Sequence, residues 1–521
     1  MDDCRPRSLR AGTPLIRPAH TESPRAQPLR QGRCNIFMPQ LHKKYGRIVR
    51  IAPDQVLVCS EDAVRIAYGA GTDFVKGDWY QACAAPDKER RIREGEHLDL
   101  LTEMRTAEYR MQRRAIGPAY SVASLEKHEH HLDTYIDHYV EKLRALNGEP
   151  VDLALWTHIY ALDALGAFVL SKNLDYAGQG NDGGNMAASD SVWGCSTMLG
   201  LFPGFIRVMH SLPKIGGMLI LPFCVALGIS IPKFWPIFGS VVPTVKARLA
   251  KLDSMKDAKM PADRPGLVLS RDTRDPEDDD NDESFDINSP EKDLLATLMK
   301  LHHDKEARFK PSWVLGISLT NFGAGHDTIM ITLAACLLTV SRHPAILSRL
   351  RQDMRDRGIT QHSRYTDTIT RVPLLLAVMK ESMRLYPAIG FFLPRVVPST
   401  GADICDTYLP AGTTMGVNMW AVHRDPTLFP DPDLFFPDRW LPDGTEQKKE
   451  EIGRMDALWL GFGGKSRSCP GQHMGRMFVI KALARLLEGF DIDTSGTPRW
   501  GGWFAVDLKG VDTSFKERAG T

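Results

Sequence analysis

The segment from Trp313 to Val340 is the feature that most limits what this sequence can fold into. It is largely apolar, and as a helix it would be long enough to cross a lipid bilayer. Its centre holds Asn321, two glycines and the run His326-Asp-Thr328, which a span facing lipid would bury at a high cost. We therefore expect a long helix through the core of a large soluble domain.

Size, charge and cysteine content exclude several classes of protein. The chain has 521 residues, 43% of them hydrophobic, which is adequate for a large core. A net charge of +1 and the absence of a basic repeat argue against nucleic acid as a partner. The nine cysteines are scattered, without the spacing of a metal site or a disulfide framework, which predicts a reducing compartment with mostly free thiols.

A glycine-rich loop near the C-terminus carries one cysteine. It reads Phe462-Gly-Gly-Lys-Ser-Arg467-Ser-Cys469-Pro-Gly471, and a helical pattern follows from Gln472 to Leu487. Glycine backbone N–H groups can turn toward the sulfur, and the N-terminal end of a helix adds positive potential. Both favour the thiolate, the form that binds a metal, although a purely structural cysteine is the alternative interpretation.

This loop resembles the haem-binding signature of the cytochrome P450 family. Four positions carry the resemblance: Phe462, Arg467, Cys469 and Gly471. The resemblance implies that Cys469 is the axial ligand of a haem b iron and that Phe462 and Arg467 contact the cofactor. Lys465 departs from the family, which usually has glycine there, and we expect Gly463 and Gly464 to supply the needed freedom.

A second motif lies upstream of the loop, in the order that the family shows. Glu381 and Arg384 are three residues apart, so on a helix they share a face and can form an ion pair. Arg439 follows in Phe436-Pro-Asp-Arg-Trp440. The resemblance implies that the three side chains form a buried network that braces the cysteine loop. The alternative is an ordinary surface pair, worth about a few tenths of a kcal/mol.

The centre of the long apolar segment, Ala324-Gly-His-Asp-Thr328, resembles the oxygen-activation motif of the same family. Thr328 offers a hydroxyl that can donate and accept, and Asp327 offers a carboxylate that can relay protons. We expect these two residues to be catalytic. The alternative is that the side chains bond only to their own helix backbone.

The resemblance also implies cationic partners for the haem propionates. Arg395, which follows the Glu-Arg helix by a short turn, is the first candidate, and Arg467 is the second. Tyr109 and Arg113 are the third, because they would share one helical face where the family often has an aromatic residue and a base. Neighbouring arginines compete with Arg113 for this place.

The expected fold is mostly α-helical with small β-sheets, the cytochrome P450 fold, with a long central helix over a cysteine-ligated haem. Helices should dominate from 120 to 390, and the sheets should come from residues near 46–59, 391–420 and the C-terminus. Two short apolar runs, Ile48–Ile51 and Gln55–Val58, predict a β-hairpin.

We predict an Arg- and Pro-rich, disordered segment at 1–40 and a single catalytic domain at 41–521. No signal peptide or membrane anchor is visible at the N-terminus, although eukaryotic family members usually begin with a membrane helix. Family analogy predicts the cytoplasmic face of the endoplasmic reticulum membrane, with a soluble cytoplasmic protein as the alternative.

Two further segments stand out by composition. Residues 215–232 carry no charge, and their glycines and prolines argue against a clean helix. We expect either an apolar lid that touches a bilayer or plain core. Residues 271–286 carry nine acidic side chains, which predicts a solvated surface loop.

The resemblance implies an enzyme, a cytochrome P450 monooxygenase that inserts one atom of O₂ into a small apolar organic molecule. The β-hairpin region and the stretch Gly412–Pro426 most resemble filamentous-fungal members of secondary metabolism. NADPH would supply electrons indirectly, through NADPH–cytochrome P450 reductase. The substrate pocket should draw on residues 79–93, Phe322 with Ala324, 389–392 and 503–504.

Two other functions remain compatible with the sequence. One is a haem-thiolate isomerase, dehydratase or ring-coupling enzyme, which would tolerate loss of the Asp-Thr pair. The other is a non-catalytic haem-binding or sensor protein, which would need neither a proton relay nor a reductase. Both Asp327 and Thr328 are present, which favours the monooxygenase.

Overall fold

The computed structural model describes residues 31–84, 98–258, 292–304 and 309–518. The predictions for the N-terminal segment 1–30 and for the acidic run 271–286 lie outside these residues. The described chain is mostly α-helical with four small sheets, and this confirms the predicted fold class.

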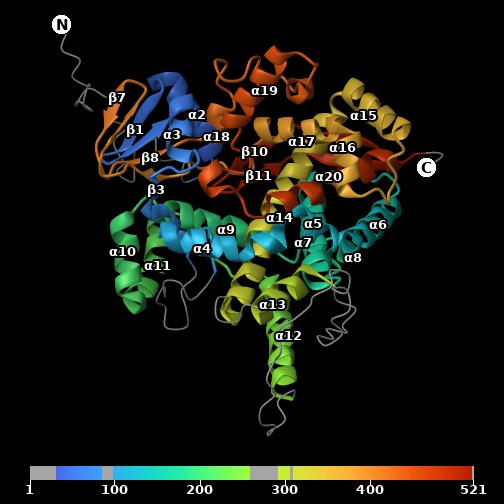
Figure 1. Cartoon of the computed structure of the whole chain (residues 1–521), viewed down its shortest axis with the longest axis horizontal. Coiled ribbons are helices and arrows are strands. Elements are labelled where there is room, and N and C mark those ends of the chain that lie inside the picture. The colour runs from blue at the N-terminus through green and yellow to red at the C-terminus, as the bar shows by residue number, and fades with distance from the viewer. Residues whose placement is uncertain (1–30, 85–97, 259–291, 305–308, 519–521) are drawn as a thin grey trace, which may run out of the picture.

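Most of the molecule is a helical body built around one long helix, α14 (Pro311–Ser341), as Figure 1 shows. The other helices are α2 (Cys34–Tyr45), α3 (Glu61–Tyr68), α4 (Thr106–Ile116), α5 (Val122–Glu126), α6 (Glu129–Ala145), α7 (Leu153–Leu170), α8 (Tyr176–Gln179), α9 (Asn185–Leu199), α10 (Pro203–Ser211), α11 (Pro213–Leu227), α12 (Phe238–Ala258), α13 (Leu294–Asp304), α15 (Pro344–Asp356), α16 (Tyr365–Arg371), α17 (Pro373–Leu385), α18 (Met419–Val422), α19 (Glu446–Leu458) and α20 (Gln472–Gly489). Four short 3₁₀ turns are η1 (Asp78–Cys83), η2 (Gly117–Tyr120), η3 (Pro437–Trp440) and η4 (Lys465–Arg467).

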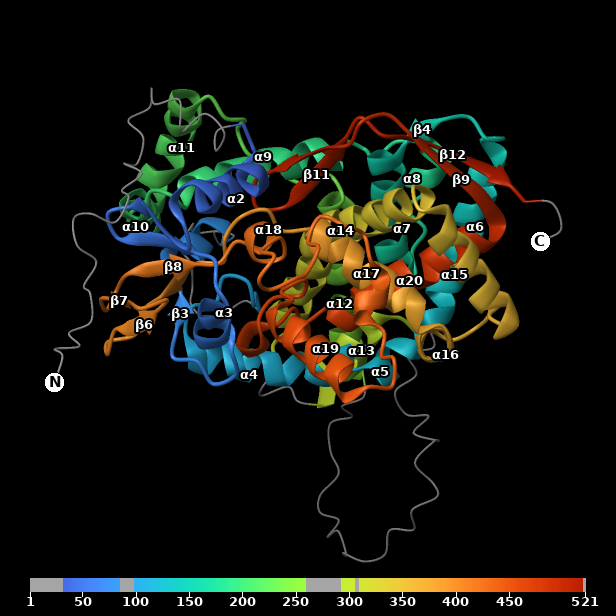
Figure 2. The same ribbon diagram turned by 90° about the horizontal axis from the view of Figure 1, so that it is seen from above.

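The strands of the described chain form four separate sheets. They are β1 (Ile48–Ala52), β2 (Gln55–Val58), β3 (Val75–Lys76), β4 (Val151–Asp152), β5 (Arg395–Val396), β6 (Ala402–Ile404), β7 (Thr407–Leu409), β8 (Thr414–Gly416), β9 (Phe490–Ser495), β10 (Arg499–Gly502), β11 (Val506–Lys509) and β12 (Asp512–Glu517). Strands β6, β7 and β8 lie at one end of the molecule, and β4, β9 and β12 lie at the other end beside α6 (Figures 1 and 2). The largest sheet has the order β1-β2-β8-β5-β3, and its β1–β2 pair is the predicted hairpin. The others are β4-β12-β9, β10-β11 and β6-β7.

Helix α14 is a core helix, as expected from its polar centre. It packs against α7, α12, α17 and α20, and most of its side chains are buried. Two helices, α7 and α14, have the length and composition of a membrane span, but 89% and 78% of their apolar windows lie buried inside the protein. The hydrophobic effect of this packing explains why so apolar a sequence is a helix in the interior.

The apolar segment 215–232 differs from its prediction, because most of it is the helix α11. The helix continues through Pro222, which cannot donate a backbone N–H and so leaves the carbonyl of Met218 without its usual partner. Met218 is 76% exposed, so water can reach this position. The same exposure rules out the expectation of plain core.

The ordered chain also begins earlier than the predicted boundary at residue 41. Helix α2 starts at Cys34, and its side chains Cys34 and Met38 are buried against α18 and β10. Arg33 forms a β-bridge to Gly502 at the other end of the chain. These contacts come from residues distant in sequence, so local composition could not reveal them.

Candidate active site

The loop that carries Cys469 is a tight turn shaped by glycines. The Cys469 N–H donates to the carbonyl of Phe462 at 2.8 Å, which closes the loop. Gly463 has φ +78°, a left-handed conformation that favours glycine, whereas Lys465 begins the 3₁₀ turn η4 with an ordinary negative φ. A Cβ on Gly464 would lie 2.3 Å from Cβ of Tyr68. Gly463 therefore supplies the conformational freedom that the sequence predicted, while Gly464 has an ordinary extended backbone and provides room for Tyr68.

The thiol of Cys469 sits at the start of helix α20 with exposed surface, although the surrounding protein is dense enough that burial raises its pKa. The N–H of Gly471 and the charges of Arg113 and Arg476 act in the opposite direction and lower the pKa. A thiol that is reachable, faces two cations and accepts a backbone N–H is well placed to bind a metal as the thiolate.

The predicted ion-pair network forms, and it is fully buried. The carboxylate of Glu381 accepts from Arg384 Nη2 at 2.9 Å and from Arg439 Nε at 3.0 Å. It also accepts from the indole N–H of Trp440 at 2.8 Å and from the backbone N–H of Phe436 at 3.0 Å. Glu381 and Arg384 have no exposed surface, so this is not the surface pair of the alternative interpretation.

His423 connects this network to the cysteine loop. Its carbonyl accepts from Arg384 Nη1 at 2.8 Å, and its Nε2 accepts the backbone N–H of Leu460 at 3.0 Å. The carbonyl of Leu460 in turn accepts the N–H of Gly463 at 2.8 Å. Burial, followed by the charges of Arg384 and Arg424, lowers the pKa of His423 to about 3, so its ring is neutral and Nε2 can accept.

Among the three arginines of helix α4, it is Arg113 that touches the cysteine loop. Its Nη1 donates to the carbonyl of Ser468 at 3.0 Å, whereas Arg110 and Arg114 are exposed. Tyr109, one turn earlier on the same face, is buried, and the guanidinium of Arg467 lies 4.6 Å above its ring. The competition that the sequence left open is thereby resolved in favour of Arg113 as the loop contact.

Arg395 lies beside Arg467 in the same cationic pocket. It is buried and donates to the hydroxyl of Tyr80 at 2.9 Å. Lys76, which the sequence analysis missed, is buried here as well and donates to the backbone carbonyls of Leu100 and Leu101. Burial and the charges of Arg467 and Arg395 hold the pKa of Lys76 well below its ordinary value.

These cations fit an anionic cofactor. Within the described residues, Lys76, Arg113, Arg395 and Arg467 form no salt bridge with any carboxylate. Nε of Arg395 and Nη1 of Arg467 are buried without a hydrogen-bond partner. Such donors would be costly unless an acceptor from outside the chain satisfied them, and the two propionates of a haem supply carboxylate acceptors.

On α14, the side chain of Asp327 is buried and points to polar partners. Trp193 Nε1 donates to its Oδ2 at 2.9 Å, and His326 Nδ1 lies 3.0 Å from its Oδ1. Burial alone would raise the pKa of Asp327, but His326, His158 and Trp193 lower it to about 2. The carboxylate is therefore charged in the interior of the protein.

Thr328 lies next to Asp327 but is only half-buried, unlike most of the surrounding helix. Its Oγ1 donates to the carbonyl of Ala324 at 2.9 Å, which is the backbone bond of the alternative interpretation. The oxygen can still accept. Helix α14 packs on α20, the helix that begins just after Cys469, so the two halves of the predicted site belong to neighbouring elements.

Aromatic rings from distant segments, three of them in the region predicted to line the substrate pocket, pack against one another. The ring of Trp79 stacks on Phe391 at 5.0 Å and on Phe504 at 4.9 Å, and Trp193 lies 5.0 Å from Phe504. Gly200 permits this packing, because a Cβ there would lie 1.9 Å from the Trp79 ring. The part of the predicted 79–93 loop from residue 85 onward lies outside the described residues. Trp193 was not predicted, since it lies far away in the sequence.

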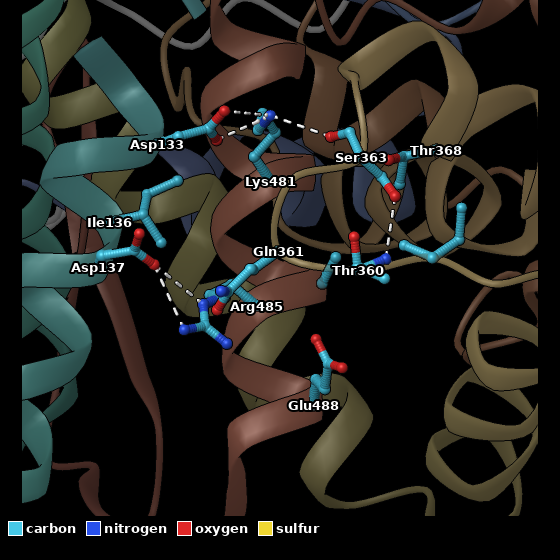
Figure 3. A pocket seen from close by; sticks show the side chains of 12 residues that line it. Asp133, Ile136, Asp137, Thr360, Gln361, Ser363, Thr368, Lys481, Arg485 and Glu488 are labelled. Carbon is cyan, nitrogen blue, oxygen red and sulfur yellow. Dashed lines mark hydrogen bonds and ion pairs between the residues drawn. The ribbon is translucent and has the colours of Figure 1, made fainter. Parts of the chain in front are cut away.

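A small cavity between α6, α16 and α20 is a structural feature and not a second site (Figure 3). Its volume of about 20 Å³ holds no more than a water. Lys481 points toward Asp133 at 2.8 Å, and Arg485 pairs with Asp137 at 3.3 Å. Lys481 is nine residues into α20 and so roughly 14 Å along its axis from the cysteine loop.

Comparisons with known proteins agree with this geometry. A family model described as Cytochrome P450 matches residues 26–500. The chain is 32% identical over 492 residues to the cytochrome P450 monooxygenase sdnT of Sordaria araneosa, covering 90% of this chain and 83% of that protein. It is 26% identical to the cytochrome P450 monooxygenase hepC of Aspergillus oryzae, over 92% and 86% of the two chains. It is also 26% identical to pisatin demethylase of Fusarium vanettenii, over 90% and 81%.

Proposed function

The chain belongs to the cytochrome P450 family and is a monooxygenase, and on this premise we propose the role of each site residue and the class of substrate. Cys469 binds the haem iron through its thiolate. Arg395, Arg467 and Arg113 hold the propionates, with Tyr109 and Phe462 as aromatic contacts of the cofactor. Once bound, the haem supplies the activation of O₂.

Glu381, Arg384 and Arg439 have a structural role in this proposal. Their network fixes the segment before η3 and, through His423 and Leu460, the start of the cysteine loop. A rigid loop holds the sulfur at one distance from the metal, and such positioning is what the protein contributes to cofactor chemistry.

Asp327 and Thr328 serve proton delivery. Asp327 holds or releases a proton at its carboxylate oxygens, and Thr328 Oγ1 accepts and passes it toward the reacting oxygen. The observation that supports this role best is the buried, charged carboxylate at the centre of an apolar helix, because a charge in such a position is costly without a function.

The substrate is a small apolar organic molecule, in keeping with the wall of Trp79, Phe391, Phe504 and Trp193. We assign the reaction to fungal secondary metabolism, because the similar proteins named above come from fungi and one of them is a pisatin demethylase. Electrons come from NADPH through NADPH–cytochrome P450 reductase. The exposed Arg110 and Arg114 on α4, beside the cysteine loop, offer charge for an acidic partner surface.

Helices α10 and α11 form an apolar surface that suits contact with a membrane, on the cytoplasmic face of the endoplasmic reticulum. Several large apolar side chains are exposed on these helices and the segment that follows: Leu212, Ile215, Met218, Leu221, Val225, Ile231 and Phe234. Exposed apolar area of this kind marks an interaction site, and an amphipathic surface can lie in the headgroup layer.

The proposal is tested by oxygen transfer. Deleting the gene in its host should cause a metabolite to accumulate, and that compound is the substrate to supply. Purified enzyme with reductase, NADPH and ¹⁸O₂ should place one ¹⁸O atom in the product, measured by mass spectrometry. Conversion without ¹⁸O and without NADPH would favour the isomerase-type alternative, and no conversion of the compound would favour a binding protein.

A further inference from the structure

Four ionisable side chains form a buried chain that leads from Asp327 toward the surface. His326 Nδ1 lies 3.0 Å from Asp327 Oδ1 and 2.9 Å from His158 Nε2. His158 Nδ1 lies 3.3 Å from Asp182 Oδ2. The members come from α14, from α7, and from the turn before α9, and α7 and α14 lie side by side (Figure 1). The two histidines have no exposed surface, whereas the Asp182 side chain is 14% exposed.

The contacts of the cluster indicate where its protons lie. Asp182 accepts from the backbone N–H groups of Gly184 and Met186, and its Oδ2 lies 3.3 Å from His158 Nδ1, which favours a proton on that nitrogen. Three basic atoms then face one another: His158 Nε2, His326 Nδ1 and Asp327 Oδ1. They can remain this close only if they share a proton, because unshared lone pairs repel.

The charge of the cluster points the same way. In the part of the chain that the structure describes, neither Asp182 nor Asp327 forms a salt bridge with a lysine or arginine. His158 lowers the pKa of Asp182 to about 2, against the effect of burial. The pKa of His158 is lowered, mainly by burial and also by His326, while Asp182 and Asp327 act to raise it. A proton shared by the two imidazoles is the positive charge nearest to the two buried carboxylates.

We propose that His158 and His326 are a proton reservoir for Asp327, reloaded from solvent between turnovers. This inference rests on the proposed function, in which Asp327 releases a proton toward Thr328. It adds two residues that the Asp-Thr motif does not contain.

In the loaded state, His158 carries a proton on each ring nitrogen, His326 carries one on Nε2, and Asp327 is a carboxylate. The Nε2 proton of His158 moves to His326 Nδ1, and the proton on that nitrogen moves to Asp327 Oδ1. The products are two neutral histidines and one carboxylic acid, and a solvent proton later reloads the pair.

The alternative occupant of this cluster is a metal ion. His158, His326 and Asp327 have the donor types of a zinc site, and Asp182 would orient His158 as an outer carboxylate. The hydrogen-bonding distances of 2.9 and 3.0 Å and the position beside a proton-delivering residue favour protons. Metal content is therefore one outcome of the test.

The first measurement needs no turnover. Protein labelled with ¹⁵N-histidine, in its reduced CO-bound form, is titrated between about pH 5 and pH 9, where imidazoles change charge. We expect the His158 ring signals, assigned by their loss in His158→Gln, to pass from charged to neutral as the pH rises. Asp182→Asn should move this change to lower pH. Ring signals that stay neutral throughout, or one bound zinc per chain by elemental analysis, would overturn the proposal.

The second measurement is coupling, the product formed per NADPH. His158→Gln should keep the haem content and the substrate affinity of the wild type but lower coupling by about tenfold, and raise the H₂O/D₂O rate ratio. Adding His326→Gln to His158→Gln should lower coupling only slightly further, because the two rings pass on the same proton. The matched control is His302→Gln, a buried histidine of α13 that bonds only the Phe309 carbonyl in the described chain.

The two proposals fail in different ways. If Thr328→Ala uncouples the enzyme and His158→Gln does not, the reservoir is wrong and the proposed function stands. If Thr328→Ala is fully coupled, the proposed function itself is wrong. Equal loss of coupling in His302→Gln and His158→Gln would show a general effect of damaged packing and would also overturn the reservoir.

Discussion

At the scale of single residues, the decisive side chains are polar groups in apolar surroundings. Asp327 is charged inside a helix whose neighbours are mostly buried and apolar, and Thr328 beside it is half-buried. A structure keeps such groups only when partners or function offset the cost of burial. Here Trp193 and His326 hold the carboxylate, and the threonine hydroxyl donates to the carbonyl of Ala324 while its oxygen can still accept.

Replacing Thr328 by alanine should uncouple the enzyme while leaving the haem in place. NADPH would be consumed at a similar rate, with peroxide released instead of product, because the proton arrives without the hydroxyl that places it. The control is Thr332→Ala, one turn further along α14, whose hydroxyl bonds the carbonyl of Thr328 and is buried. Peroxide and product per NADPH are the measurements, and a fully coupled Thr328→Ala enzyme would contradict the assignment.

The sequence was enough to select candidate residues that lie in short motifs, and their catalytic roles stay predictions. Cys469, Asp327 and Glu381 each sit in a pattern whose chemistry is local, and the structure brings Glu381, Arg384 and Arg439 together as predicted. It was not enough for His158, Asp182 or Lys76. Their roles depend on contacts between distant segments, and an isolated histidine in an apolar run resembles any core residue.

At the scale of elements, the buried network of Glu381, Arg384 and Arg439 joins α17 to the loop before η3 and, through His423, to the cysteine loop. Glu381 accepts hydrogen bonds from two arginines, an indole and a backbone N–H, so one carboxylate sets the position of three segments. In helix α11, by contrast, the local preference of proline gave a wrong prediction. Pro222 predicted a break, but tertiary context and solvent around Met218 allow the helix to continue.

Glu381→Ala should destabilise the protein by about 3–5 kcal/mol, because two buried guanidinium groups lose their counter-charge. The expected protein is poor in haem and unfolds early in a denaturant titration. Glu446→Ala is the matched control: it pairs with Lys449 at the same spacing, but both are exposed, so the change should stay within roughly 0.5 kcal/mol. Equal stability of the two variants would contradict the structural role of the Glu381 network.

At the scale of the whole molecule, two surfaces differ in chemistry: one is apolar and the other is positively charged. Helices α10 and α11 carry exposed apolar side chains, and helix α4, with Arg110 and Arg114 exposed, contacts the cysteine loop through Arg113. The proposed function assigns the first of these surfaces to a bilayer, from which apolar substrates partition, and the second to a redox partner. The sequence indicated the apolar segment but could not show which of its side chains are exposed.

The double variant Met218→Glu, Val225→Glu should weaken binding to phosphatidylcholine–phosphatidylserine vesicles by roughly tenfold or more, since each exposed side chain would otherwise bury apolar area. Co-sedimentation measures the bound fraction. Leu434→Glu, at an exposed apolar position away from α10 and α11, should bind as the wild type does. Unchanged binding of the double variant would place membrane contact elsewhere.

The most direct test of the whole account is the spectrum of the reduced, CO-bound protein. Cys469 is the cysteine in a glycine-shaped loop that accepts a backbone N–H and faces two arginines, so we predict the long-wavelength band of a thiolate-ligated haem. Cys469→Ser should abolish this band, while Cys336→Ser, a buried cysteine of α14, should keep it. An unchanged band in Cys469→Ser would contradict the central assignment.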